Sequence, residues 1–120
     1  MTVSVLDPAV LESLRSLNQP GEPDVVQEIL TLFVAEAPAR LAAIAGAVEA
    51  GDAPALQRAA HALKGSAAAI GATALQRICA EVEEVARSGV MAGASAGIES
   101  IRGANAALHA EIDHLLCRPS

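Results

Sequence analysis

His61 is the residue of this 120-residue chain whose surroundings are best suited to chemistry. A helix turns about 100° per residue, which fixes the neighbours of any residue on its outer face. For His61 these neighbours are polar or small, and they are Gln57, Arg58, Lys64, Gly65 and Ala68. An imidazole near neutral pH can act as a nucleophile and as a proton carrier. Lys64, one turn later, places an ammonium within reach of any anion attached to the ring.

Gly65 is an unusual residue for this position. A glycine inside a helix costs about 1 kcal/mol relative to alanine, and this segment is otherwise rich in alanine. Gly65 and Ala68 therefore suggest that another protein approaches His61 closely. Nothing nearby in the sequence would hold a divalent metal or a nucleotide. A histidine phosphorylated by another protein fits this pattern better than a self-sufficient enzyme.

Hydrophobic residues at helical spacing predict the elements that position His61. Asp7-Pro8 begins a short first helix, and the segment 18–23 reads as a turn-rich linker. Longer helices are expected over about 24–50, 53–70, 75–88 and 98–116, with a kink at Pro38. The segment 89–97 is expected to be a mobile loop or the frayed start of the last helix. Leu56, Ala59, Leu63, Ala67 and Ile70 are expected to form the buried side of the third long segment, 53–70.

Composition supports the same fold class. Hydrophobic residues make up 52% of the chain, but Phe33 is the single aromatic residue, so the core must be aliphatic and rich in alanine. The alternation typical of strands is missing. We therefore predict one all-α domain over residues 1–120, an antiparallel up-down four-helix bundle with a short additional N-terminal helix.

Charge and cysteine content exclude several functional classes. A net charge of −6 argues against general nucleic-acid binding. The sequence shows neither a signal peptide nor a charge-free apolar run of the roughly 18 residues that a membrane span needs. Cys79 and Cys117 fit no disulfide framework, and Cys79 reads as a small buried hydrophobe. A cytoplasmic monomer with no membrane or nucleic-acid partner is the resulting expectation.

The sequence does not predict a metal site. His114 and Cys117 have i,i+3 spacing, but no further ligands cluster near them at a terminus that we expect to be frayed. Glu81, Glu83 and Glu84 read as a solvated helix face. A di-metal bundle would need Glu-x-x-His motifs, which the chain does not contain. The sequence predicts neither a metal nor a cofactor.

The string His61-Ala62-Leu63-Lys64-Gly65-Ser66, followed by Gly71-Ala72, closely resembles the histidine-containing phosphotransfer (HPt) domain of multistep phosphorelays. The flanking helices extend this resemblance over roughly residues 24–89. It implies that His61 accepts a phosphoryl group from the aspartyl phosphate of a receiver domain and passes it to another receiver aspartate. It also implies a phosphocarrier without catalytic activity of its own, with the receiver supplying Mg²⁺. The implied partners are response-regulator receiver domains and a hybrid sensor histidine kinase.

The resemblance also implies roles for the residues around His61. Lys64 would stabilise the charge of the phosphate, and Gly65 would let the receiver dock without a clash. Ser66 would support the site by hydrogen bonding, and Glu83 would orient the ring. Gln57, Arg58 and Ala68 would line the docking face, and Gln57 is the alternative residue for orienting the ring. Ala69 departs from the family, many members of which carry a polar residue there.

Two other functions remain open on the sequence. The same bundle could serve only for docking, with His61 never phosphorylated. An acid–base enzyme using His61 would need a concave pocket, which the flat face lined by alanine and glycine argues against. The sequence names neither the partner receivers nor the direction of phosphate flow. Met1 and the full set of helices favour a free-standing protein over an excised module.

Overall fold

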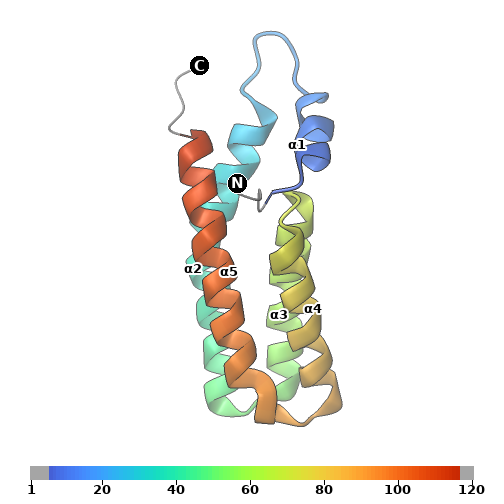
Figure 1. Cartoon of the computed structure of the whole chain (residues 1–120), viewed down its shortest axis with the longest axis vertical. Coiled ribbons are helices and arrows are strands. Elements are labelled where there is room, and N and C mark those ends of the chain that lie inside the picture. The colour runs from blue at the N-terminus through green and yellow to red at the C-terminus, as the bar shows by residue number, and fades with distance from the viewer. Residues whose placement is uncertain (1–5, 117–120) are drawn as a thin grey trace, which may run out of the picture.

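The structure, a computed structural model, describes residues 6–116. Its elements are α1 (Pro8–Arg15), α2 (Val25–Ala50), α3 (Ala53–Ala69), α4 (Thr73–Ser88), a 3-10 turn (Met91–Gly93) and α5 (Ala94–Leu116), and these described residues include no strand. The four long helices run alternately up and down, and each packs against two neighbours in the order α2, α3, α4, α5 (Figure 1). The predicted all-α bundle with a short extra helix is confirmed.

The helix boundaries follow from local chemistry. Asp7, Asp24 and Asp52 each accept a hydrogen bond from a backbone N–H at the start of α1, α2 and α3. Gly51 ends α2 in the left-handed conformation, with φ of 66°. These caps explain why the boundaries agree closely with those expected. Two boundaries differ from those expected: α5 begins at Ala94 rather than near residue 98, and α1 ends at Arg15, so that Leu17 lies beyond it and is largely exposed.

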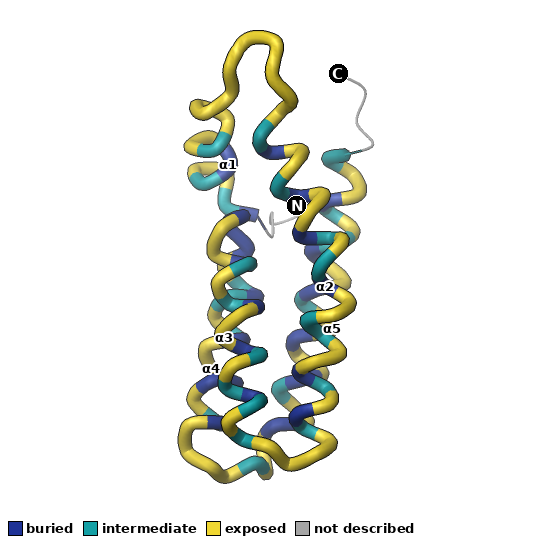
Figure 2. Tube along the Cα trace, turned by 180° about the vertical axis from the view of Figure 1, so that it is seen from behind, coloured by how far each residue is buried: buried dark blue, intermediate teal, exposed yellow. Residues whose placement is uncertain are grey.

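The core is aliphatic, as composition predicts, and buried positions line the inner side of every long helix (Figure 2). Phe33, the one aromatic residue, is 7% exposed. On α3 the buried residues are Leu56, Ala60, Leu63 and Ala67, so Ala60 takes the central place expected for Ala59, which is only partly buried. The inward face of α3 is thus rotated slightly from the expected one, and His61 still lies on the opposite side.

Two features interrupt the predicted helical pattern: Pro38 within α2, and the segment 89–97 around the start of α5. α2 is one continuous helix through Pro38. The segment 89–97 holds the 3-10 turn and then the first turn of α5, where Ala94 is 1% exposed. By length and composition α2 could also cross a membrane, although it is not free of charged residues. Its stripe through Val26, Leu30 and Phe33 instead packs into the bundle core.

α1 closes the upper end of the bundle at the turn between α3 and α4. The backbone N–H of Asp7 donates to the carbonyl of Gly71 over 2.7 Å. Gly71 has φ of 76°, and a Cβ there would lie 2.9 Å from Cβ of Val10. Glycine at position 71 therefore allows both the left-handed turn and the close approach of α1. The contact fixes the end of α3, the helix that carries His61.

Gly97 of α5 lies close against Val82 of α4, and its replacement is expected to loosen the bundle. A Cβ at position 97 would lie 2.7 Å from Cγ2 of the buried, β-branched Val82. We expect Gly97→Ala to lower the free energy of unfolding by about 1 kcal/mol, because overpacking outweighs the gain in helix propensity. Gly103→Ala, also in α5, is the control, since a Cβ there meets nothing within 4 Å. It should raise stability by about 0.5–1 kcal/mol. Urea denaturation of both variants measures the difference, and equal shifts would contradict the prediction.

Candidate functional site

α3 presents His61 to solvent on a rigid support. The side chain of His61 is 69% exposed. On the opposite side of the same helix Leu56, Ala60 and Leu63 are fully buried. Packing of this inward face against the core fixes the position of the helix, and the imidazole is accessible to a partner. His61 thus lies on the outer face of its helix, as the sequence predicts.

Glu83 of α4 lies behind the imidazole, and three side chains meet at its carboxylate. Its Oε2 is 3.2 Å from Nδ1 of His61, and its Oε1 is 2.6 Å from Nζ of Lys64. Nη2 of Arg87, one turn further along α4, donates to Oε2 over 3.3 Å. The Glu83 side chain is only 7% exposed, because this part of α4 faces α3. A buried acid thus joins the two helices beneath the histidine.

The pKa of the Glu83 carboxyl lies below its usual value. The largest cause is the hydrogen bond from Lys64 to the charged form; burial opposes the shift, and the hydrogen bond from His61 adds to it. An ionised carboxylate can only accept hydrogen bonds, so Nδ1 of His61 must be the donor. The Nε2 atom of a neutral ring then carries the free lone pair. Glu83 thereby determines which ring nitrogen is left free of a hydrogen bond to it.

Gly65 and Ala68 lie beside His61 on the exposed surface of α3. A Cβ on Gly65 would meet no atom within 4 Å, so packing inside this chain does not require glycine there. Gly46 and Gly103 are equally unobstructed, and openness alone therefore assigns no role. What distinguishes Gly65 is its position one helical turn after the histidine.

The other predicted site residues do not reach the ring. Ser66 donates from its hydroxyl to the carbonyl of Ala62, over 3.3 Å, within its own helix. Within residues 6–116, Gln57 makes no hydrogen bond to His61, although it is half-buried on the same helix. Arg58 is exposed on the turn before His61. Of the two candidates for orienting the ring, Glu83 is the one in contact with it.

Arg87 and a groove beside the site were not predicted as site features. Arg87 bonds to Glu83 and also to Glu84, at the i+4 and i+3 spacings that the sequence shows. The groove, of about 450 Å³, separates α2 from α3 and passes Ala59 and Ala62, the residues flanking His61 on one side. Ala35, Ala39 and Ala43 form its α2 wall, and Arg40 pairs there with Glu36 over 2.7 Å. The spacing of these three alanines at i, i+4 and i+8 is the feature of the sequence that could have predicted the groove.

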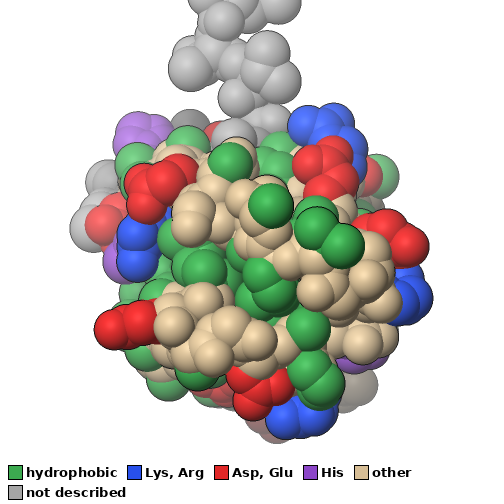
Figure 3. Space-filling view, turned by 90° about the horizontal axis from the view of Figure 1, so that it is seen from below, with side chains coloured by type: hydrophobic (Ala, Val, Ile, Leu, Met, Phe, Trp, Pro, Cys, Tyr) green, Lys and Arg blue, Asp and Glu red, His purple; other side chains and the backbone are tan. Residues whose placement is uncertain are grey.

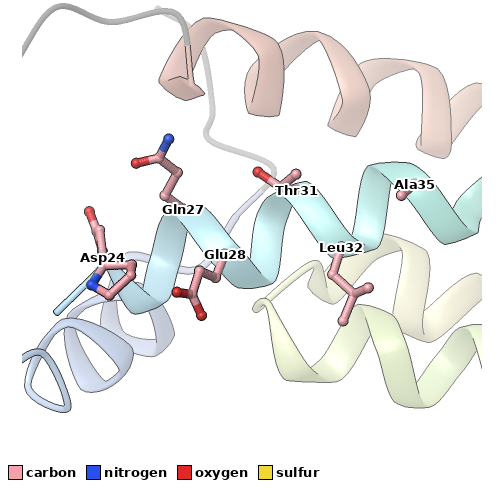
Figure 4. Close-up of a pocket in the computed structure, with 7 residues that line it drawn as sticks. Asp24, Gln27, Glu28, Thr31, Leu32 and Ala35 are labelled. Atoms are coloured by element: carbon pink, nitrogen blue, oxygen red, sulfur yellow. The ribbon is translucent and has the colours of Figure 1, made fainter.

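A second hollow, of about 500 Å³, lies along the N-terminal part of α2, and its lining does not include His61, Lys64 or Glu83. Its lining residues run from Pro23 to Ala35 and all belong to α2 and its N-terminal turn. In Figure 4 Gln27 and Thr31 point to one side of the helix, whereas Glu28 and Leu32 point to the other. This feature is an open helix face rather than an enclosed pocket.

The thiol of Cys79 adds no reactive group to the site around His61. Cys79 is fully buried, and burial raises the pKa of its thiol to about 12. Among residues 6–116 no three His, Cys, Asp or Glu side chains gather as a metal site. Cys117, which shares i,i+3 spacing with His114, lies outside the described residues. Seen from below, the end of the bundle shows hydrophobic side chains among backbone and uncharged polar groups at its centre, and charged side chains toward its rim (Figure 3).

Comparisons with known proteins identify the family of the chain. A sequence model of the Hpt domain matches residues 28–116. Among solved structures, histidine-containing phosphotransfer protein B (HptB) from Pseudomonas aeruginosa PAO1 is similar over 99% of this chain and 100% of its own, with 33% identity and a TM-score of 0.89. A search of curated proteins finds no match. This chain therefore belongs to the Hpt domain family, the phosphocarriers of phosphorelays.

Proposed function

We propose that His61 is the phosphoacceptor of this chain, and that it takes a phosphoryl group from a receiver aspartate and delivers it to another. The observation that carries the proposal is the 3.2 Å contact between Nδ1 of His61 and the buried carboxylate of Glu83. This contact leaves the Nε2 lone pair directed at solvent, where an aspartyl phosphate can approach in line. Lys64 supplies a positive charge one turn away.

The chemistry divides between the two proteins. Phosphoryl transfer depends on alignment and on neutralising the charge of the transferred group. The receiver supplies the Mg²⁺ and the aspartate. This chain supplies an oriented neutral imidazole and one ammonium group, which suffices for a carrier.

The surface around His61 is the proposed docking face, formed by Gln57, Arg58, Gly65 and Ala68. Small side chains at its centre let the receiver bring its aspartate close to the ring. The cations Arg58, Lys64 and Arg87 lie on α3 and α4 around the histidine. Their charge complements the acidic site of a receiver, which favours fast encounter. The carrier would act as a cytoplasmic monomer, with a hybrid sensor kinase as a further partner.

The test is transfer from receiver domains. Each receiver of the host is phosphorylated with labelled phosphate and mixed with the wild-type chain. We expect at least one receiver to transfer label in an acid-labile, base-stable linkage, and mass spectrometry to place it on the peptide containing His61. Label on another residue, or no transfer from any receiver, would exclude the carrier function and leave a docking role.

A further inference from the structure

Lys64 has two possible partners, and in this structure it binds the one that is not the phosphate. Its Nζ lies 2.6 Å from Oε1 of Glu83, which makes this the shortest contact of the carboxylate. The proposed function needs the same ammonium on the phosphoryl group. A lysine held by a buried acid is not free to neutralise a second anion at full strength, so the two requirements compete.

We infer that phosphorylation of His61 exchanges these partners: Lys64 leaves Glu83 for the phosphoryl oxygens, and Glu83 becomes the counter-ion of the positively charged ring. The inference rests on the proposed function and specifies what Glu83 does in it. Glu83 contacts the ring at Nδ1 and not at the reacting Nε2, so it acts as a positioning residue. Its negative charge also stabilises the positively charged ring.

The transfer step moves no proton from one atom to another. The lone pair of Nε2 forms the new P–N bond, while the P–O bond of the acyl phosphate breaks and its electron pair stays on the receiver carboxylate. The proton on Nδ1 remains there, facing Glu83. The ring therefore gains one positive charge at the same moment as it gains the phosphoryl group. That charge forms within hydrogen-bond distance of the Glu83 carboxylate.

The two side chains differ in their freedom to move, which determines which one leaves. Glu83 is 7% exposed and is held from two sides, by the ring and by Arg87. Lys64 is 29% exposed and carries three donors on a flexible stem. A phosphoryl group on Nε2 brings two negative charges to the solvent side. Lys64 can turn toward it, and the carboxylate stays in place.

The remaining charges near the ring do not replace either partner. Arg87 is shared between Glu83 and Glu84 on α4. On α2, Arg40 is paired with Glu36, and on α3 Arg58 lies on the turn before His61. Glu83 is thus the acid in contact with the ring among the described residues, and Lys64 is the cation bound to that acid most closely.

The exchange has a consequence for the lifetime of the phosphorylated ring. When the P–N bond breaks with the proton still on Nδ1, the leaving group is a neutral imidazole, which leaves more readily than an anionic one. A carboxylate at position 83 keeps that proton in place. A neutral amide there would hold it less firmly, and the phosphorylated ring would persist longer.

The experiment uses the whole chain phosphorylated with phosphoramidate, a small donor that needs no receiver, and follows the decay of phosphohistidine by ³¹P NMR. We expect Glu83→Gln to lengthen the half-life about tenfold, the effect of losing one hydrogen bond to a charged group. Lys64→Gln should shorten it by a factor of about three, because the partly exposed ammonium no longer neutralises the phosphoryl group. Glu84→Gln is the matched control: its carboxylate is one residue away and 71% exposed, and within residues 6–116 it pairs with Arg87 and not with His61 or Lys64.

Opposite changes in the two variants separate the exchange from a merely structural role, since a disordered site would change both half-lives in one direction. An unchanged or shortened half-life in Glu83→Gln, or a longer one in Lys64→Gln, overturns the inference and leaves the carrier function intact. Failure of the wild type to be phosphorylated by phosphoramidate and by every receiver would instead remove the proposed function itself. Circular dichroism of each variant checks that the bundle is folded.

Discussion

Replacing His61 with glutamine is expected to abolish phosphoryl transfer to the chain and to change the free energy of unfolding by less than about 0.5 kcal/mol. The loss is complete because an amide nitrogen has no lone pair available to attack phosphorus. Stability is kept because the His61 side chain is 69% exposed and contributes nothing to the core. Glu83 is not left as an unpaired buried charge, since Lys64 and Arg87 still bind it.

Transfer from a phosphorylated receiver, with urea denaturation alongside, measures both halves of this expectation. His109→Gln is the matched control, because His109 also lies on a long helix, α5, and is 44% exposed. It should accept phosphate as the wild type does. Undiminished labelling of His61→Gln would show that another nucleophile carries the phosphate. Loss of labelling together with a large loss of stability would show a structural role for His61 instead.

The helices could be predicted because their signals are local. Asp24 and Asp52 cap the helices that follow them, and Gly51 ends one of those helices, so the boundaries are written in two or three adjacent residues. The outward position of His61 was predictable for a similar reason, since the spacing of Leu56, Leu63 and Ala67 defines the opposite face. The displacement from Ala59 to Ala60 shows the limit of such spacing, because the neighbouring helices determine the final rotation of α3.

The contacts of Glu83 could not be derived from spacing. Glu81, Glu83 and Glu84 look alike along the chain, and only the packing of α4 against α3 buries the second of them beneath the imidazole. Family resemblance pointed to Glu83, but the meeting of Lys64 and Arg87 on the same carboxylate depends on the relative height of two helices. The groove between α2 and α3 depends on such a register too.

Replacing Gly65 with glutamine is expected to lower the rate of transfer from a receiver on the order of 100-fold, while making the isolated protein more stable. The two effects separate because the position is crowded only when a partner is bound. In the free chain a Cβ at position 65 meets nothing within 4 Å, and glutamine is a better helix former than glycine by roughly 0.5–1 kcal/mol. In the complex the added side chain would occupy the space beside His61 that the receiver must enter, and a clash of about 2.7 kcal/mol gives a factor of 100.

Gly103→Gln, on the exposed side of α5, is the matched control, because a Cβ there is equally unobstructed. It should gain similar stability and keep the wild-type transfer rate. Phosphoramidate gives a second comparison, since a donor this small needs no docking surface and should label His61 in Gly65→Gln as fast as in the wild type. Slow labelling by both donors would mean that the substitution disturbs the imidazole itself. Wild-type transfer from the receiver in Gly65→Gln would place the docking face elsewhere on the bundle, and the glycine would then have no function that its surroundings explain.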